Sequence, residues 1–295
     1  MRYTIEKEFI RLTVDSLGAE MVSVIDVATG REMLWCADPT VWNRHAPILF
    51  PYAGKLTGGH FLAEDGKVYE GGQHGFARDL EHRLVSQTAN ELTFELTSGG
   101  ETYAYFPYDF ALRSTYTLEG RRISHSVAVR NTGKGTLRFG FGYHPGFALP
   151  FDDAHTAEDY DVVFDTIESP LCLNTAPNGL VCASPDYYLA RNVDRIPLSA
   201  KLFAHDSHCM VKLKSKTMAV VERDTGRRIV VDIADFPYTL IWSTPQEPMR
   251  FICIEPWHSI PSEDNGPIEW EKKPCAASLA PNEMWQTTLN MTFER

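Results

Sequence analysis

Apolar and polar residues alternate with a period of two along several short segments of the chain. The alternation is clearest at residues 92–96, 123–129 and 285–293. Successive side chains of a β-strand point to opposite faces, so this pattern predicts strands with one buried face. Turn sequences such as Asn131-Thr-Gly133 and Asp224-Thr-Gly226 follow or separate such segments, and no amphipathic helix of three or more turns is evident. The pattern therefore predicts a predominantly antiparallel β-protein.

Three further runs, at residues 229–233, 238–242 and 251–254, are rich in β-branched and aromatic residues. Such runs are typical of strands covered on both faces, so we expect them near the centre of a sheet. The stretch from Asp152 to Arg195 looks loop-like, and no linker, charge block or internal repeat divides the chain. We therefore predict a single domain over residues 1–295. We expect this domain to be all-β. Because open sheets rarely exceed ~10 strands, an all-β domain of this length needs two large packed sheets, which predicts a large antiparallel β-sandwich.

Composition and charge exclude several function classes. The 295 residues are 43% hydrophobic and 23% charged, as in ordinary globular proteins. The formal net charge of -11 leaves no basic footprint for a nucleic-acid partner. Neither a signal peptide nor an apolar stretch of membrane-spanning length is present, so we expect no membrane partner. Six cysteines without a C-x-x-C pair fit reduced thiols in a cytoplasmic protein.

Candidate functional residues lie where glycine, proline or aromatic residues follow strand-like runs. Lys55 follows Gly54, but leucines at 49 and 56 exclude a phosphate-binding P-loop, and a solvated lysine is the alternative. His74 lies among glycines that would let a ligand approach the backbone, although a loop histidine bonded to backbone fits equally. His144 precedes a proline that restricts it to extended conformations.

Glu255 ends an apolar run, so its carboxylate is either paired in the interior or poised in a cleft as a general base. The aromatic rings of Tyr143 and Phe147 flank His144 and offer a stacking surface for a sugar, with the hydrophobic core as the alternative. The segment His205–Cys209 superficially resembles a metal site. In a strand Asp206 would share a face with His208 but not with His205 or Cys209, so we expect no metal ligand set there, and Asp206 remains a candidate hydrogen-bond acceptor.

Taken together and in order, five segments of the chain resemble the aldose 1-epimerase (galactose mutarotase) family, in particular its LacX-like branch. The resemblance runs nearly end to end. The segments are His45-Ala-Pro-Ile-Leu-Phe-Pro with Gly54-Lys55, His74-Gly-Phe-Ala-Arg78, Gly142-Tyr-His-Pro-Gly-Phe147, Leu202-Phe-x-x-Asp206 and Cys253-Ile-Glu-Pro-Trp257. Each of them is weak alone, whereas five in register are specific.

The resemblance implies a β-sandwich of the galactose mutarotase-like (supersandwich) type with a sugar-binding cleft and no cofactor. It assigns Glu255 as general base and His144 as general acid. It also assigns His74 as the second active-site histidine and Asp206 as the acid that binds a substrate hydroxyl. Lys55 stands where many members have arginine, which loses the planar fork and leaves sugar orientation open. Arg78 lies within a matching segment, and Trp257 is our own inference as a stacking surface.

The resemblance also implies an activity, the interconversion of the α and β anomers of a free aldohexose, and we expect a monomer or homodimer. The alternatives are a non-catalytic sugar-binding or regulatory module on the same fold, and an epimerase of a phosphorylated hexose. A glycosidase using Glu255 and Asp206 is a third possibility, which leaves the histidines without a role.

Overall fold

Strands make up nearly all of the regular structure, as the alternating pattern predicts. The computed structural model describes residues 1–295. It contains no α-helix, and its helical segments are short 3₁₀ turns: η1 (Thr57–Gly59), η2 (Ala77–Asp79), η3 (Thr102–Ala104), η4 (Ala157–Asp159), η5 (Ala200–Phe203) and η6 (Trp270–Lys272). The predicted all-β class is confirmed.

The largest sheet has nine antiparallel strands. In spatial order they are β17 (Val193–Pro197), β14 (Tyr160–Glu168), β19 (Thr217–Glu222), β20 (Arg228–Asp232), β24 (Met284–Glu294), β10 (Arg122–Asn131), β9 (Phe110–Glu119), β8 (Glu91–Thr97) and β7 (Arg83–Gln87). The three clearest alternating segments form β8, β10 and β24. Buried side chains alternate along β10 and β24, whereas β8 also buries Thr93. The last strand, β24, therefore lies in the middle of this sheet.

A second sheet has eight strands and carries most of the chemistry described below. Its order is β16 (Tyr187–Tyr188), β15 (Leu171–Leu173), β18 (His208–Val211), β21 (Tyr238–Trp242), β22 (Phe251–Trp257), β12 (Gly142–Tyr143) and β4 (Ile48–Leu49), with β13 (Gly146–Ala148) also pairing with β22. All seven residues of β22 are buried. The expectation that this run is central and covered is confirmed.

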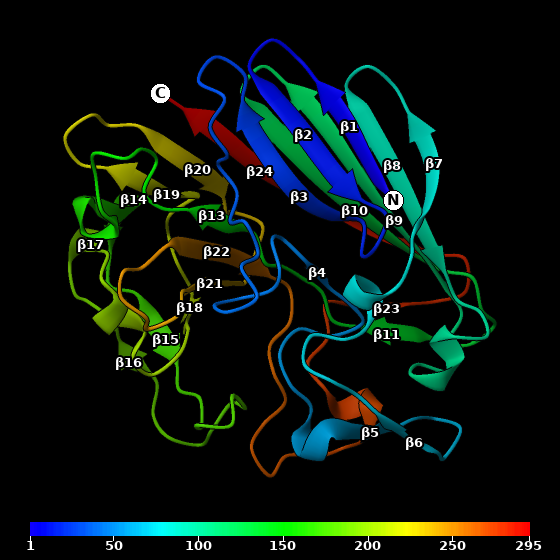
Figure 1. Ribbon diagram of the computed structural model, residues 1–295. Helices are drawn as coiled ribbons and strands as arrows, with labels where there is room; N and C mark the ends of the chain where they lie inside the picture. The colour runs from blue at the N-terminus through cyan, green and yellow to red at the C-terminus, as the bar shows by residue number, and fades with distance from the viewer.

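Three smaller sheets complete the fold. One has three strands, β1 (Arg2–Glu6), β2 (Ile10–Asp15) and β3 (Glu20–Asp26), and the others are the pairs β5 (His60–Leu62) with β6 (Val68–Glu70) and β11 (Leu137–Phe139) with β23 (Ala277–Leu279). In Figure 1 the three-stranded sheet lies over β8, β9 and β10, while β21 and β22 lie nearer the centre of the molecule.

Both the three-stranded and the eight-stranded sheet pack against the nine-stranded one. The ring of Tyr3 in β1 meets Phe94 of β8 edge-on at 5.6 Å, and Phe147 of β13 meets Phe293 of β24 at 6.3 Å. Sixty-one buried residues form one contiguous hydrophobic cluster across these layers. This layered packing of antiparallel sheets is the predicted β-sandwich.

The region from Asp152 to Arg195 is more regular than we predicted. It contains β14, β15 and β16 and the start of β17. The expectation of a loop was wrong because β14 carries acidic residues, such as Asp161 and Asp165, that disguise its apolar positions. The run at 229–233 also differs in part, since β20 buries one face only and its Arg228 is exposed.

Phe50 lies at the centre of an aromatic cluster, and its removal should destabilise the fold. Its side chain is fully buried and its ring contacts four others, those of Phe76, Phe106, Phe110 and Phe139. Phe50→Ala is expected to lower the free energy of unfolding by about 3–5 kcal/mol, measured by urea denaturation. Val68→Ala, at an exposed position, is the control, with a change within about 0.5 kcal/mol. Equal effects of the two substitutions would contradict this account of the core.

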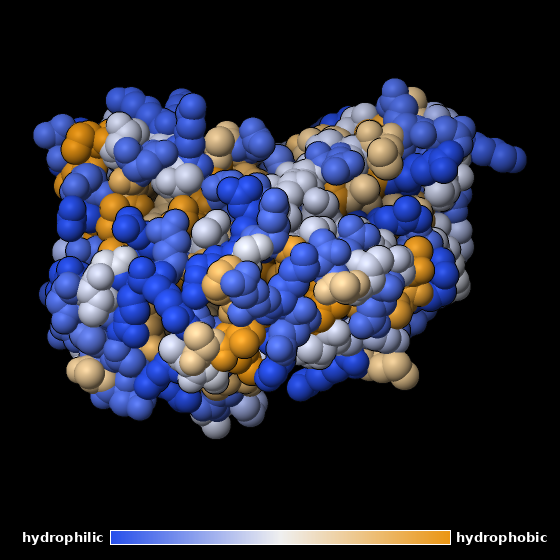
Figure 2. Space-filling view, turned by 90° about the horizontal axis from the view of Figure 1, so that it is seen from above, coloured by the Kyte–Doolittle hydropathy of each residue, from blue (hydrophilic) through white to orange (hydrophobic).

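On the face shown in Figure 2, hydrophilic residues predominate and hydrophobic ones form scattered patches. No helix in the structure has the length and apolar character that crossing a membrane requires.

Candidate active site

A cavity of about 400 Å³ opens beside the eight-stranded sheet. This volume lies within the range of ~300–1,000 Å³ that small-molecule sites occupy. Its walls come from the segments 42–44, 54–55 and 73–78, from the strands β21 and β22, from the segments 173–181 and 206–209, and from residues 144 and 261. Seven of the predicted site residues line it, namely Lys55, His74, Arg78, His144, Asp206, Glu255 and Trp257.

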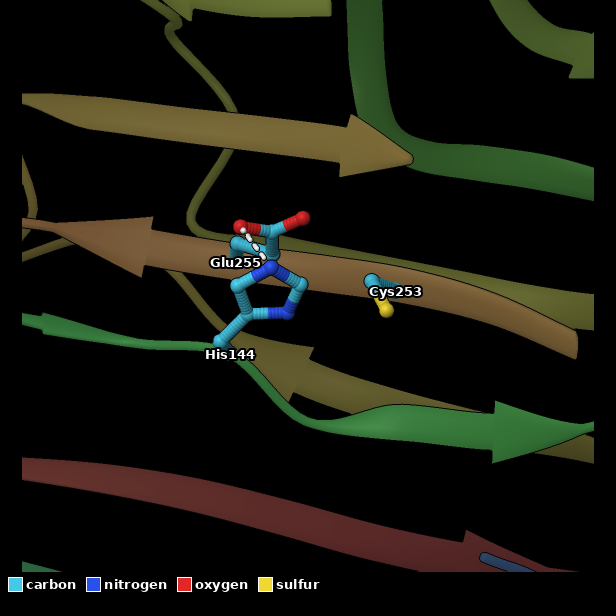
Figure 3. A group of neighbouring side chains, drawn as sticks. All are labelled: His144, Cys253 and Glu255. Atoms are coloured by element: carbon cyan, nitrogen blue, oxygen red, sulfur yellow. Dashed lines mark ion pairs between the residues drawn. The ribbon is translucent and has the colours of Figure 1, made fainter. Parts of the chain in front are cut away.

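Glu255 and His144 form a buried pair at the wall of this cavity. Glu255 lies on β22 and is 1% exposed, and His144 directly follows β12 and is 7% exposed. The Nε2 atom of His144 lies 3.3 Å from an Oε2 oxygen of Glu255. Figure 3 shows the imidazole directed at that carboxyl group from the neighbouring strand segment. Pairing of β12 with β22 brings the two side chains together, although 111 sequence positions separate them.

Burial favours the neutral form of both members of the pair. It raises the pKa of Glu255 well above its usual range, and the negative charge of Asp206 raises it further. Burial lowers the pKa of His144 to about 3, with a contribution from the positive charge of Arg78. The shifts favour a carboxylic acid at Glu255 beside a neutral imidazole at His144, so the one proton that the pair can exchange rests on Glu255. The family assignment, an ionised Glu255 and a protonated His144, has the same charge with the proton shifted.

Two tryptophans that sequence reasoning missed pack around His144. The indole of Trp42 stacks on the imidazole with ring centroids 4.9 Å apart, and Trp242 meets it edge-on at 5.7 Å. The Nδ1 atom of His144 is buried and has no hydrogen-bond partner. The orientation of the imidazole is therefore set by aromatic packing together with the contact of Nε2 with Glu255. Neither tryptophan lies in a segment that carried the resemblance, so nothing in the sequence linked them to His144.

The second histidine is fixed through the backbone of Gly54. The Nδ1 atom of His74 accepts a hydrogen bond from the Gly54 N–H at 2.9 Å, and the backbone N–H of His74 donates to the Gly54 carbonyl at 2.7 Å. A neutral His74 therefore carries its proton on Nε2, and burial keeps its pKa well below the usual value. The following Gly75 has a φ of 70°, and a Cβ there would lie 2.2 Å from the Phe50 carbonyl oxygen. Only glycine fits this turn.

Three cationic side chains line the cavity. Lys55 donates from Nζ to the Asn178 carbonyl at 2.8 Å, and Arg78 donates to the Gln73 carbonyl at 2.7 Å. The third, Arg44, donates to the Arg78 carbonyl at 3.1 Å. Arg44 also pairs with Asp79. Sequence reasoning did not propose Arg44 as a site residue. The one signal for it was its position directly before the matching segment that begins at His45.

Asp206 lines the cavity from a turn, which differs from the strand that we assumed. Its φ is 87°, and it lies between η5 and the start of β18. The strand-face argument therefore does not apply to Asp206. His208 uses both ring nitrogens inside the protein: Nε2 contacts the Leu202 carbonyl and Nδ1 the Tyr187 hydroxyl, each at 2.7 Å. Those contacts leave His208 without a nitrogen for a metal.

Trp257 lines the cavity, whereas Tyr143 and Phe147 do not. The Trp257 indole donates from Nε1 to the Tyr143 carbonyl at 3.1 Å. The hydroxyl of Tyr143 donates to the His125 carbonyl at 2.7 Å in the core, and Phe147 is fully buried. The expectation that these two rings stack on a sugar was wrong. Because neighbouring residues of an extended chain point to opposite sides, Tyr143 enters the core where His144 faces the cavity.

Comparison with known proteins places these features in a wider group. Residues 1–292 match the family described as aldose 1-epimerase. The chain is 31% identical over 300 residues to the chromosomal protein LacX of Lactococcus lactis subsp. lactis, an alignment that covers 99% of each protein. The predicted resemblance to this family and to LacX is confirmed.

Solved structures show the same fold. A galactose mutarotase related enzyme from Lactobacillus acidophilus superimposes with a TM-score of 0.94 at 30% identity, covering 100% of this chain and 98% of the other. A galactose mutarotase-like protein from Lactobacillus casei gives 0.91 at 28% identity, with complete coverage of both chains. The architecture is therefore the galactose mutarotase-like β-sandwich.

Proposed function

Because the chain belongs to the aldose 1-epimerase family, we propose that it interconverts the α and β anomers of an aldohexose by general acid–base catalysis. The observation that carries this proposal is the buried Glu255–His144 pair, 3.3 Å apart at the wall of the cavity. The six cysteines are free thiols, which supports a reducing compartment such as the cytoplasm.

The reaction needs one group that accepts a proton and one that donates a proton. Glu255 takes the proton of the C1 hydroxyl while His144 gives one to the ring oxygen, and the bond between C1 and that oxygen breaks. Rotation about the C1–C2 bond and reversal of both transfers give the other anomer. The transfers begin after the resting proton moves from Glu255 to His144. Substrate hydroxyls that donate to Glu255 favour this shift, because they stabilise the carboxylate.

The other lining residues would hold the sugar. Asp206 accepts from a ring hydroxyl, and His74 donates from Nε2, since Gly54 occupies its Nδ1. In the free protein this Nε2 contacts the Gln73 side-chain amide at 3.0 Å, a contact that the sugar would replace. Lys55 and Arg78 donate to further hydroxyls. The indole of Trp257 offers an apolar face for the sugar C–H groups.

Polarimetry tests this function directly. Freshly dissolved α-glucose or α-galactose should lose its initial rotation faster with the protein than in buffer alone. A non-catalytic sugar-binding or regulatory module would leave the rate at the buffer value even where calorimetry detects binding. Release of nitrophenol from aryl glycosides would instead support the glycosidase alternative, with Glu255 and Asp206 as its carboxylate pair.

A phosphorylated hexose is the second candidate substrate. Lys55, Arg44 and Arg78 all line the cavity, and cationic side chains are the usual ligands of phosphate. Rates for free and 6-phosphorylated glucose and galactose distinguish the two substrate classes. A higher kcat/KM for the phosphorylated sugar that falls to the value of the free sugar in Arg44→Ala would favour this candidate.

The pH profile of kcat/KM should show an alkaline limb that belongs to Glu255. The active pair holds one proton, and the raised pKa of Glu255 means that this proton is lost only well above the usual carboxyl range. Protonation of His144 near pH 3 would set the acidic limb. We therefore expect nearly constant kcat/KM from about pH 4 up to the alkaline limb, measured with corrections for the uncatalysed rate. An acidic limb near pH 6 would contradict this assignment.

Catalysis should not depend on a metal ion, because an acid and a base suffice for the two proton transfers. After dialysis against EDTA, kcat should equal or exceed that of the untreated protein. Activity that is lost on dialysis and restored by one specific divalent ion would overturn this expectation.

A further inference from the structure

We propose that Cys253 joins His144 and Glu255 in a binding site for a thiophilic divalent cation such as Zn²⁺, and that occupation of this site inactivates the enzyme. One donor atom from each of the three side chains lies within 4.8 Å of the other two. Binding does not depend on the proposed function, whereas inactivation rests on it. Cys253 has no part in the two proton transfers.

The local backbone fixes this grouping. Cys253 and Glu255 are two positions apart on β22, so their side chains leave the strand on the same side. Figure 3 shows the carboxyl group of Glu255 above the imidazole of His144 and the thiol of Cys253 to the right of the ring. Donors up to 4.8 Å apart need to move inward by less than about 1 Å each to reach bond lengths of ~2.0–2.3 Å to zinc.

The donor chemistry selects the class of ion. A thiolate, an imidazole and a carboxylate are a typical zinc set, whereas Mg²⁺ and Ca²⁺ prefer oxygen ligands alone. With the thiol and carboxyl protons released to solvent, the two anionic ligands balance the charge of a divalent ion. A neutral complex suits a site in which all three side chains are buried.

The cavity gives an ion a route to this place. His144 and Glu255 line the cavity, whereas Cys253 does not line it and is fully buried. An ion held by the three would therefore keep one coordination position open toward the cavity, for water or a sugar hydroxyl. With their lone pairs bound to the metal, His144 and Glu255 could not exchange protons with a substrate.

Cobalt binding tests the site without reference to activity. Co²⁺ added to the chelated wild-type protein should give a thiolate-to-cobalt charge-transfer band in the near ultraviolet, at one ion per chain. Cys253→Ala and the nearly isosteric Cys253→Ser should lose the band. Cys209→Ala is the matched control, since this buried thiol lines the same cavity and is absent from the proposed set. Loss of the band in Cys209→Ala with retention in both Cys253 variants would overturn the proposal.

Zinc inhibition of mutarotation tests the consequence. In the wild type and in Cys209→Ala, micromolar Zn²⁺ should abolish activity and EDTA should restore it, while Mg²⁺ should have no effect. Cys253→Ala should keep its zinc-free activity and need about 100-fold more Zn²⁺, because losing even an outer-shell partner costs 10–100-fold in metal affinity. Cobalt binding with unchanged activity in zinc would overturn the inhibitory role. Absence of any mutarotation would refute the proposed function, and the cobalt band would still decide the site.

Discussion

Glu255→Gln is expected to lower kcat for mutarotation by ~10²-fold or more. The amide is nearly isosteric with the carboxyl group, but it cannot accept the proton of the C1 hydroxyl. The substitution also removes the proton that Glu255 carries in the free protein and passes to His144 before the reaction. Polarimetric progress curves at saturating sugar measure the effect. Retention of more than about a tenth of the wild-type kcat would show that Glu255 is not the base.

The control for this substitution is a buried carboxyl group outside the site. Glu168 is 4% exposed and accepts hydrogen bonds from the backbone of Lys214 and Ser215 at 2.6 and 2.7 Å. Glu168→Gln should lower the free energy of unfolding, because the amide supplies a weaker acceptor for those bonds. It should leave kcat close to that of the wild type. The two variants together separate loss of chemistry from loss of fold.

His144→Asn is expected to lower kcat by a similar factor, ~10²-fold or more. Asparagine cannot carry a transferable proton, and the partner atom 3.3 Å from Glu255 is lost. The pH profile is a second measurement. With His144 gone, an ionised Glu255 can still accept but has no acid beside it, so the remaining activity should no longer fall with rising pH.

His74→Asn is the matched control for the acid. Because Nδ1 of His74 is occupied by the Gly54 N–H, its loss should raise KM and reduce kcat less than the loss of His144 does. The alkaline limb should persist in this variant. A larger loss of kcat in His74→Asn, together with disappearance of that limb, would require the two histidines to exchange roles.

Most of the fold could be predicted from the sequence because strand patterning is local. The alternation at 123–129 specifies one buried face within a few residues, and β10 forms there. The same logic missed β14, because the acidic residues Asp161 and Glu168 are buried within it and break the apolar pattern. Which strands pair is a long-range property: β12 and β22 meet although some 110 positions separate them, and only the resemblance placed Glu255 beside His144.

The failures at the site have a related cause. Tyr143 is next to His144 in sequence yet points to the opposite side, whereas Trp42 is distant in sequence and stacks on the imidazole. Protonation states are still less accessible. The pKa of His144 falls because side chains from several strands exclude water, and no local pattern records that exclusion.

The central position of β24 has a consequence for how the protein can be made. This strand pairs with β10 on one side and β20 on the other. The two halves of the nine-stranded sheet therefore cannot be joined until residues 284–294 have left the ribosome. Until then β10 and β20 each present an unpaired edge, the kind of surface that recruits other chains. Pairings between such distant segments also form slowly. The nascent chain therefore passes through a stage in which chaperones that shield strand edges would matter most.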